Sequence, residues 1–249
     1  MTEQHLDHSS RKIYRKFLIF QSSISILLLA VTAFYLQTVS SGYVFGIVLT
    51  ILWVLGSHGF LAYSLRAWRT PADWATLFRF LVGIAGLIMA SYGEAVWLIL
   101  AMMSLASLGD WMDGRLAALY GETPQGAILD VETDQALVLM LAVLGITVGG
   151  VGVWLLLFPL YRYGYVLLLE IFAIPADDPK PKAGGNLRGR VVCAATQVAL
   201  LGNLLLPLAL PAKTLLSALA LVFLTYSFAD DMLYQFRGRF IHSFYSPKS

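Results

Sequence analysis

The chain has 249 residues, of which 58% are hydrophobic and only 13% are charged, and its mean hydropathy is +0.73. A soluble domain is nearer one quarter charged, so this composition excludes an ordinary soluble protein and predicts an integral membrane protein. The formal net charge of +2 is small and gives no reason to expect a nucleic-acid partner. The single cysteine, Cys193, excludes an intrachain disulfide and a multi-cysteine metal site.

Apolar runs long enough to span a bilayer follow a polar N-terminal segment. The fold predicted is all-α, a polytopic membrane helix bundle of about eight transmembrane helices. We expect these helices near residues 17–37, 43–65, 76–92, 94–114, 130–149, 151–172, 190–210 and 214–235. A change of composition near Arg66–Pro71 divides the chain into two parts. Residues 1–69 hold a cytoplasmic segment and two accessory helices, and residues 70–249 hold a six-helix core and a short tail.

The distribution of basic residues orients this bundle. With the N-terminus in the cytoplasm, 15 of the 17 lysines and arginines fall on or near the cytoplasmic side. Lys213 falls outside, and Arg162 falls within a span. We therefore expect both chain termini in the cytoplasm.

Four aspartates lie at or near the ends of apolar runs, in a chain with few charges. Asp110 and Asp113 are spaced i, i+3, and Asp130 and Asp134 are spaced i, i+4, so each pair shares one helix face. Carboxylates at a membrane edge are costly unless a cation or a hydrogen-bonding partner compensates them. Two helix ends that each present two carboxylates can hold hard divalent cations. The positive-inside orientation puts this stretch at the cytoplasmic face.

Small residues accompany the aspartates. Gly114 and Ala117 follow the first pair on the same helix, and Gly126 precedes the second pair. Small side chains let a bulky group approach the backbone closely. Together with divalent cations on the carboxylates, this arrangement describes a diphosphate pocket, because metal ions bridge phosphate oxygens and neutralise developing charge.

The pattern resembles the signature of the CDP-alcohol phosphotransferases (the CDP-alcohol phosphatidyltransferase family), D-x2-D-G-x2-A-R-x8-G-x3-D-x3-D. The matching residues are Asp110, Asp113, Gly114, Ala117, Gly126, Asp130 and Asp134. Residues 70–79 resemble the family's Pro-Asn-x-x-Thr-x-x-Arg entry to its first core helix, and residues 185–190 resemble its basic Gly-Lys-x-Lys-Thr segment. The resemblance covers residues 70–235. It departs at Ala118, where the family has arginine, and in the connection to Gly126, which is one residue short.

The resemblance implies a transferase of phospholipid synthesis that uses Mg²⁺ or Mn²⁺, two ions in all. Asp110, Asp113, Asp130 and Asp134 would bind the metals, and Asp134 would also act as general base on an acceptor alcohol. The donor would be CDP-diacylglycerol or another CDP-alcohol, and CMP would be released. Membrane lipids would be further partners, and family members of this kind are commonly homodimers.

Other residues are open to two interpretations each. Asp73 fits a helix N-cap or first-turn position, and it also fits a place beside the nucleotide. Arg115 is a possible substitute for the family's missing arginine, although it points to a different helix face. Arg79 is either a snorkelling anchor or a contact for an acceptor phosphate. Arg162 shares a helix face with Glu170, which suggests a structural ion pair or the lining of an acceptor cavity.

Arg188 and Arg190 precede the seventh expected helix. They fit either acceptor binding or simple anchoring at the cytoplasmic side.

Two further functions explain part of the pattern. A catalytically silent relative, binding a nucleotide or lipid as a scaffold subunit, is favoured by Ala118 and the short connection, and opposed by the intact aspartates. A transporter with an acidic site would explain intramembrane carboxylates, but it would not explain the glycine and alanine spacing.

Overall fold

The computed structural model describes residues 8–38, 42–65, 69–121, 123–172, 187–205 and 207–245. In this part of the chain the secondary structure is helical. The elements are α1 (His8–Thr38), α2 (Gly42–Leu65), α3 (Pro71–Ser91), α4 (Val96–Tyr120), α5 (Pro124–Thr147), the 3₁₀ helix η2 (Val153–Leu156), α6 (Leu157–Ile171), α7 (Leu187–Gly202) and α8 (Leu210–Tyr245). The all-α prediction is confirmed for these residues.

Among the described residues, six segments are long and apolar enough to cross a membrane, so the chain is an integral membrane protein. They lie in α1, α2, α3, α4, α8 and the continuous segment of η2 and α6. The helix α5 carries Asp130, Glu132 and Asp134, and α7 has only 16 residues. The count of eight membrane crossings therefore stays a prediction for these two helices.

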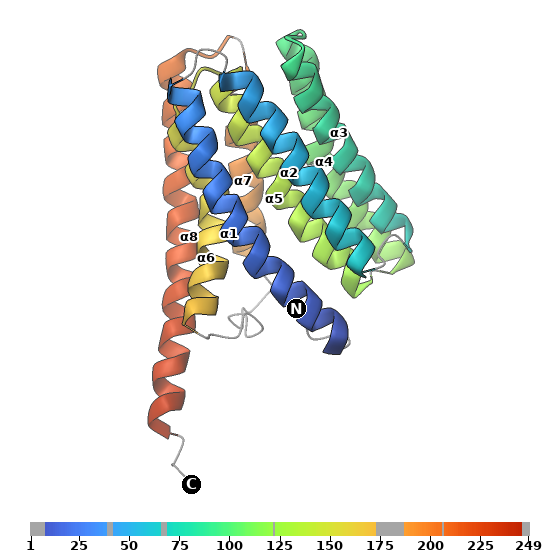
Figure 1. Cartoon of the computed structure of the whole chain (residues 1–249), viewed down its shortest axis with the longest axis vertical. Coiled ribbons are helices and arrows are strands. Elements are labelled where there is room, and N and C mark those ends of the chain that lie inside the picture. Colours follow the sequence, from blue (N-terminus) through green and yellow to red (C-terminus); the bar gives the residue numbers. More distant parts are fainter. Residues whose placement is uncertain are drawn as a thin grey trace.

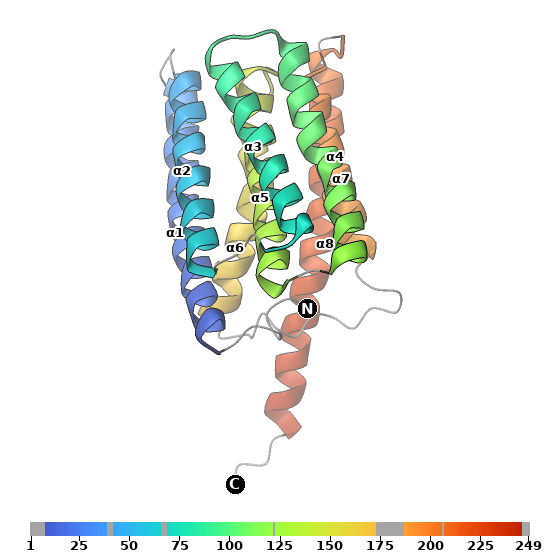
Figure 2. The ribbon, with the colours of Figure 1, turned by 90° about the vertical axis from the view of Figure 1, so that its right-hand side faces the viewer.

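The helix α5 is the central element of the bundle (Figure 2). Its residues from Gln135 to Gly145 are buried without interruption. A helix that is apolar all round is enclosed either by lipid or by other helices, and α5 is enclosed by helices, since it packs against α2, α3, α4, α6 and α7. Most side chains of α5 therefore lie inside the protein, whereas Val131 is 39% exposed.

The first two helices pack on the core as a hairpin (Figure 1). The helix α1 lies against α6, and α2 lies against α5 and α3. The buried side chains of α1 include polar ones: Tyr14, Gln21, Ser22, Ser25 and Thr32. Buried polar groups in a membrane protein need protein partners, and Ser25 accepts a hydrogen bond from Trp53 Nε1 of α2 at 3.0 Å.

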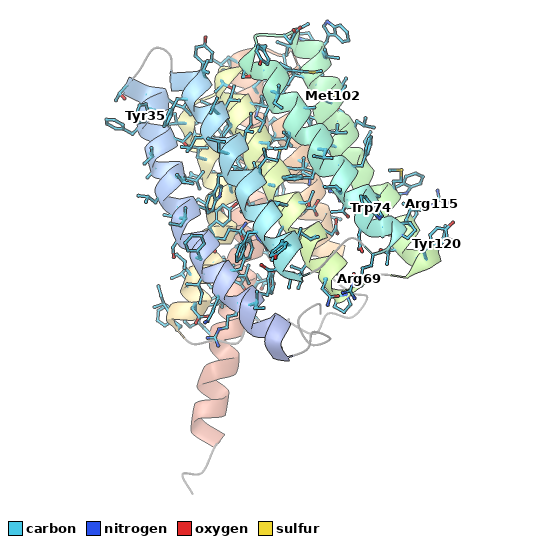
Figure 3. The ribbon with its side chains drawn as sticks, turned by 45° about the vertical axis from the view of Figure 1, so that its right-hand side comes forward. Tyr35, Arg69, Trp74, Met102, Arg115 and Tyr120 are labelled. Atoms are coloured by element: carbon cyan, nitrogen blue, oxygen red, sulfur yellow. The ribbon has the colours of Figure 1, made fainter. Side chains whose placement is uncertain are left out.

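The start of α3 and the end of α4 lie at the same end of the bundle. Figure 3 shows Arg69 and Trp74 at the start of α3 at the same end as Arg115 and Tyr120 near the end of α4, whereas Tyr35 and Met102 lie toward the opposite end. The helix α1 begins and α8 ends at the end where α3 starts (Figures 1 and 2). This arrangement agrees with the expectation that both termini lie on one side.

Candidate active site

The start of α3 is set by a capping box. Thr70 Oγ1 accepts a hydrogen bond from Asp73 N at 3.3 Å, and Asp73 Oδ2 accepts hydrogen bonds from the backbone of Thr70 at 2.9 Å and Arg69 at 2.7 Å. Pro71 occupies the first turn, where a missing N–H costs nothing. The first-turn interpretation of Asp73 is thus confirmed, whereas the N-cap itself is Thr70. Its nucleotide contact stays a prediction, and the burial of Asp73 weighs against it.

The start of α5 is built in the same way and packs against that cap. Thr123 Oγ1 accepts a hydrogen bond from Gly126 N at 2.9 Å, and Pro124 follows the cap. A Cβ on Gly126 would lie 1.9 Å from Asp73 Oδ1. Gly126 therefore lets α5 begin directly against α3. The space that this glycine leaves is filled by Asp73 of the protein itself.

The four aspartates converge on one side chain, Arg79 of α3. Its Nη1 lies 2.5 Å from Asp113 Oδ2, 2.8 Å from Asp130 Oδ1 and 3.5 Å from Asp110 Oδ1. Its Nη2 donates to Asp134 Oδ1. The expected meeting of the α4 pair with the α5 pair is present, and a guanidinium sits between them.

The pocket for Arg79 is prepared by α4. A Cβ on Gly109 would lie 2.5 Å from Arg79 Cγ, so the glycine makes room for the arginine stem. Arg79 Nε donates to the carbonyl oxygen of Ala106 at 3.3 Å. The arginine side chain is fully buried, so the interpretation of Arg79 as a snorkelling anchor is wrong: the guanidinium turns inward because four carboxylates attract it. Contact with an acceptor phosphate stays a prediction.

The four aspartates differ in exposure, so the site has a buried end and an opening to the outside. The exposed fraction of the side chain is 6% for Asp113, 25% for Asp134, 31% for Asp130 and 56% for Asp110. Asp113 lies at the buried end, where Thr76 Oγ1 donates to its Oδ2 at 3.4 Å. The other three carboxylates are accessible from outside.

The accessible carboxylates fit a divalent cation. Asp110, Asp130 and Asp134 each offer an oxygen, and these three oxygens lie within 4.8 Å of one another. An all-oxygen donor set suits Mg²⁺ or Mn²⁺. Because one guanidinium cannot neutralise four carboxylates, a further positive charge would stabilise the group.

The helix α4 leaves its backbone open beside these carboxylates. Gly114 is exposed, and a Cβ there would meet no atom within 4 Å. Ala117, one turn further, is half-buried. A bulky ligand at the opening can therefore approach the α4 backbone, as the sequence predicts.

Two further candidate arginines, Arg115 and Arg162, contact groups other than the four aspartates. Arg115 packs its guanidinium over the Trp111 ring at 4.6 Å from the centroid, and both side chains are exposed. The expected sharing of a face by Arg162 and Glu170 yields no ion pair between them. Arg162 pairs with Glu132 of α5, and Glu170 pairs with Arg15 of α1 at 2.7 Å.

The side chains of Arg188 and Arg190 lie outside the described residues, so their role stays a prediction. Two residues escaped the sequence reasoning: Gly109, which makes room for Arg79, and Glu132, which pairs with Arg162. The signal for Glu132 was an acidic residue between two site aspartates in an apolar run. The signal for Gly109 was a glycine directly before Asp110.

A family model for CDP-alcohol phosphatidyltransferases matches residues 69–236, which is more than half of the chain. The chain belongs to the CDP-alcohol phosphatidyltransferase family. The resemblance inferred from the aspartate signature is confirmed. Comparison with curated proteins and with solved structures returned no match.

Membership in the CDP-alcohol phosphatidyltransferase family places the chain among the transferases of phospholipid synthesis in general. The matched region begins just before α3 and ends within α8, so it contains the four aspartates and Arg79. The helices α1 and α2 precede it.

Proposed function

We propose that the protein transfers a substituted phosphate from a CDP-alcohol, CDP-diacylglycerol in the first instance, to an acceptor alcohol, with release of CMP. The observation that carries this proposal is the convergence of Asp110, Asp113, Asp130 and Asp134 beside an open stretch of α4 in a member of this family. The donor's acyl chains would reach the bilayer between helices while its polar part lies at the opening.

Divalent cations, two Mg²⁺ or Mn²⁺ ions, would be held by these four aspartates. When bound they would neutralise the diphosphate of the donor and stabilise the charge that develops during transfer. The oxygen-only donor set and the excess of carboxylates over Arg79 support this assignment. The outer carboxylates are the accessible ones, so a cation would reach them without unfolding the bundle.

Asp134 would serve as the general base. Arg79 occupies its Oδ1, which leaves Oδ2 to take the proton of the acceptor hydroxyl. As that proton leaves, the acceptor oxygen forms a bond to the β-phosphorus of the donor, and the bond from this phosphorus to the bridging oxygen breaks. CMP carries away the electron pair of the broken bond. A positioned base of this kind is worth about 10²–10⁴-fold in rate.

The open backbone at Gly114 and Ala117 would receive the nucleotide part of the donor. We assign Arg115, Gly126 and Asp73 to the same region. Gly126 would act indirectly, because it allows α5 to begin against α3 beside the nucleotide. The acceptor would be bound by Arg188 and Arg190, because the other two candidates are engaged elsewhere: Arg79 is fully buried among the aspartates, and Arg162 pairs with Glu132.

We further propose that the site and both termini face the cytoplasm, where CDP-linked donors are available. Residues 70–249 form the catalytic core and residues 1–69 an additional segment. The protein is proposed to act as a homodimer, as the resemblance implies.

The second candidate is a catalytically silent relative that binds a nucleotide or lipid as a scaffold subunit. Two observations favour it: Ala118 stands where the signature has arginine, and Arg79 occupies the centre of the aspartates. The four intact carboxylates favour the enzyme.

The decisive experiment is CMP release from CDP-diacylglycerol by purified protein with Mg²⁺ and a panel of acceptor alcohols. We expect acceptor-dependent release that Asp134→Asn lowers by at least about 10²-fold, because the amide cannot take the proton. CDP binding in the presence of Mg²⁺ should persist in this variant. Mg²⁺-dependent CDP binding without CMP release from any acceptor would favour the silent relative.

A further inference from the structure

A second charged cluster lies on α5, away from the candidate site. Glu132 is buried, with 1% of its side chain exposed. Arg162 Nη2 of α6 donates to Glu132 Oε1, and Tyr14 Oη of α1 donates to the same oxygen at 3.3 Å. We call these three residues the Glu132 cluster. It joins α5 to α6 and to the first helix of the chain, which lies outside the family match.

The Glu132 cluster and the aspartates occupy opposite faces of α5. Glu132 stands two residues from Asp130 and two from Asp134, which is about 200° around an α-helix. Arg79 of α3 holds the face with the two aspartates, and Arg162 of α6 holds the face with Glu132. The views in Figures 1 and 2 show α5 between α3 and the pair of α1 and α6, in agreement with the packing of α3 and α6 on α5. The helix α5 thus forms ion pairs with an arginine on each of two opposite faces.

Stability alone does not account for a charge at position 132. A buried ion pair is often no more stabilising than apolar residues of the same volume, because both ions lose their hydration. The second oxygen, Glu132 Oε2, is buried with no hydrogen-bond partner among the described residues, which adds a further cost. Ionisable groups inside a membrane bundle are retained where they have a function.

We propose that Glu132 is a positioning residue, which sets the rotation of α5 and so places Asp130 and Asp134 for metal binding and proton transfer. This inference rests on the proposed transferase function. A carboxylate about 6 Å from the helix axis moves about 2 Å when the helix turns by about 20°. Catalytic groups must be held within about 0.5 Å and 10–20° of their working geometry, so an unanchored α5 loses the site. Through Tyr14, the helix α1 supports this position of α5 from outside the catalytic core.

The test uses the full-length protein with the double substitution Glu132→Leu and Arg162→Leu, which removes both charges and leaves no buried ion unpaired. We expect its melting temperature to stay within a few degrees of wild type, while kcat falls by about 10–100-fold. The KM for the acceptor should be unchanged. The affinity for Mn²⁺, measured by electron paramagnetic resonance without substrate, should fall several-fold because two of its ligands are displaced. Arg162→Lys, which keeps a donor cation beside Glu132, should retain kcat within about threefold.

Matched variants separate positioning from a general effect on folding. Arg15 is the residue after Tyr14, and its exposed ion pair with Glu170 also joins α1 to α6. Arg15→Gln breaks this pair and should change neither kcat nor Mn²⁺ affinity. Should the double variant fail to fold, Tyr14→Phe removes only the hydroxyl, and the ring keeps its place against Phe17. We expect Tyr14→Phe to lower kcat by about 2–5-fold.

Wild-type kcat and Mn²⁺ affinity in the double variant would overturn the inference. A loss confined to the KM for the acceptor would also overturn it, since Arg162 would then be an acceptor ligand. If the wild-type protein releases no CMP from any CDP-alcohol, the proposed function fails, and the Mn²⁺ titration still decides whether Glu132 positions the aspartates.

Discussion

At the scale of single residues, Arg79 decides the state of the candidate site. Four carboxylates within reach of one another repel, and each is costly to ionise near a membrane. The guanidinium of Arg79 contacts all four aspartates, and Gly109 supplies the space for its stem. The arginine therefore organises the carboxylates in the absence of a cation, and a bound cation would share that task.

Replacing Arg79 by methionine keeps much of the side-chain volume and removes the charge. We expect the melting temperature without Mg²⁺ to fall, by the equivalent of about 3 kcal/mol, because a buried partner such as Asp113 is left uncompensated. Saturating Mg²⁺ should restore more of that loss than it adds to wild type. Thermal unfolding in detergent with and without Mg²⁺ measures both effects, with Arg15→Gln as the control. Equal Mg²⁺-induced shifts in Arg79→Met and wild type would mean that the cation does not replace the charge of Arg79, and no shift in either protein would contradict a cation site on these aspartates.

At the scale of elements, the site depends on how two helix starts meet. Thr70-Pro71 begins α3 and Thr123-Pro124 begins α5, each with a threonine cap. The two starts touch where Gly126 lies against Asp73. This contact holds Asp130, one turn further along α5, beside Arg79.

Gly126→Ala should separate these two helices. The new methyl group would lie 1.9 Å from Asp73 Oδ1, and the carboxylate cannot turn away freely because its Oδ2 caps α3. We expect a loss of about 1–3 kcal/mol in stability, as for other overpacked sites, together with weaker Mg²⁺-dependent CDP binding. Thermal unfolding and a CDP-binding titration check this expectation. Adding Asp73→Ala should relieve the clash and return part of the stability, less the cost of about 1 kcal/mol for the lost cap. No recovery in the double variant would mean that the glycine acts elsewhere.

At the scale of the whole molecule, the bundle has two chemically distinct ends. The starts of α3 and α5, with their caps, and the exposed Tyr120 at the end of α4 lie at one end, where α1 also begins and α8 ends. The turn after α3, with the exposed Tyr92, joins α3 to α4 at the other end. The excess of basic residues near the first end favours the cytoplasm for it.

Single cysteines at these two positions test the orientation. In a Cys193→Ser background, a membrane-impermeant maleimide applied to intact cells should label Tyr92→Cys and leave Tyr120→Cys unlabelled. Both should react after the cells are opened, which controls for accessibility. The reverse labelling pattern would place the aspartates on the outer side, away from CDP-linked donors.

The sequence by itself determined the class of the protein and the four aspartates of its candidate site. Hydropathy over runs of about 20 residues predicts membrane helices, because the bilayer imposes one length and one polarity on every span. The i, i+3 and i, i+4 aspartates are local patterns that follow from helix geometry alone. Both were therefore readable without a structure, and so was the family resemblance that the comparison confirms.

Only the tertiary structure decided which groups compensate those charges. Arg79 is 31 residues from Asp110 and 55 from Asp134, and Arg162 pairs with Glu132 rather than with Glu170, its neighbour on the same helix face. Such partners depend on how helices rotate and pack against one another, and no local pattern specifies that rotation. The same holds for Gly126. Only a glycine fits at this position, because Asp73 of α3 fills the space that a side chain would need. The local sequence thus determines where helices form and which charges they carry, whereas the packing of the helices determines which of these charges form pairs.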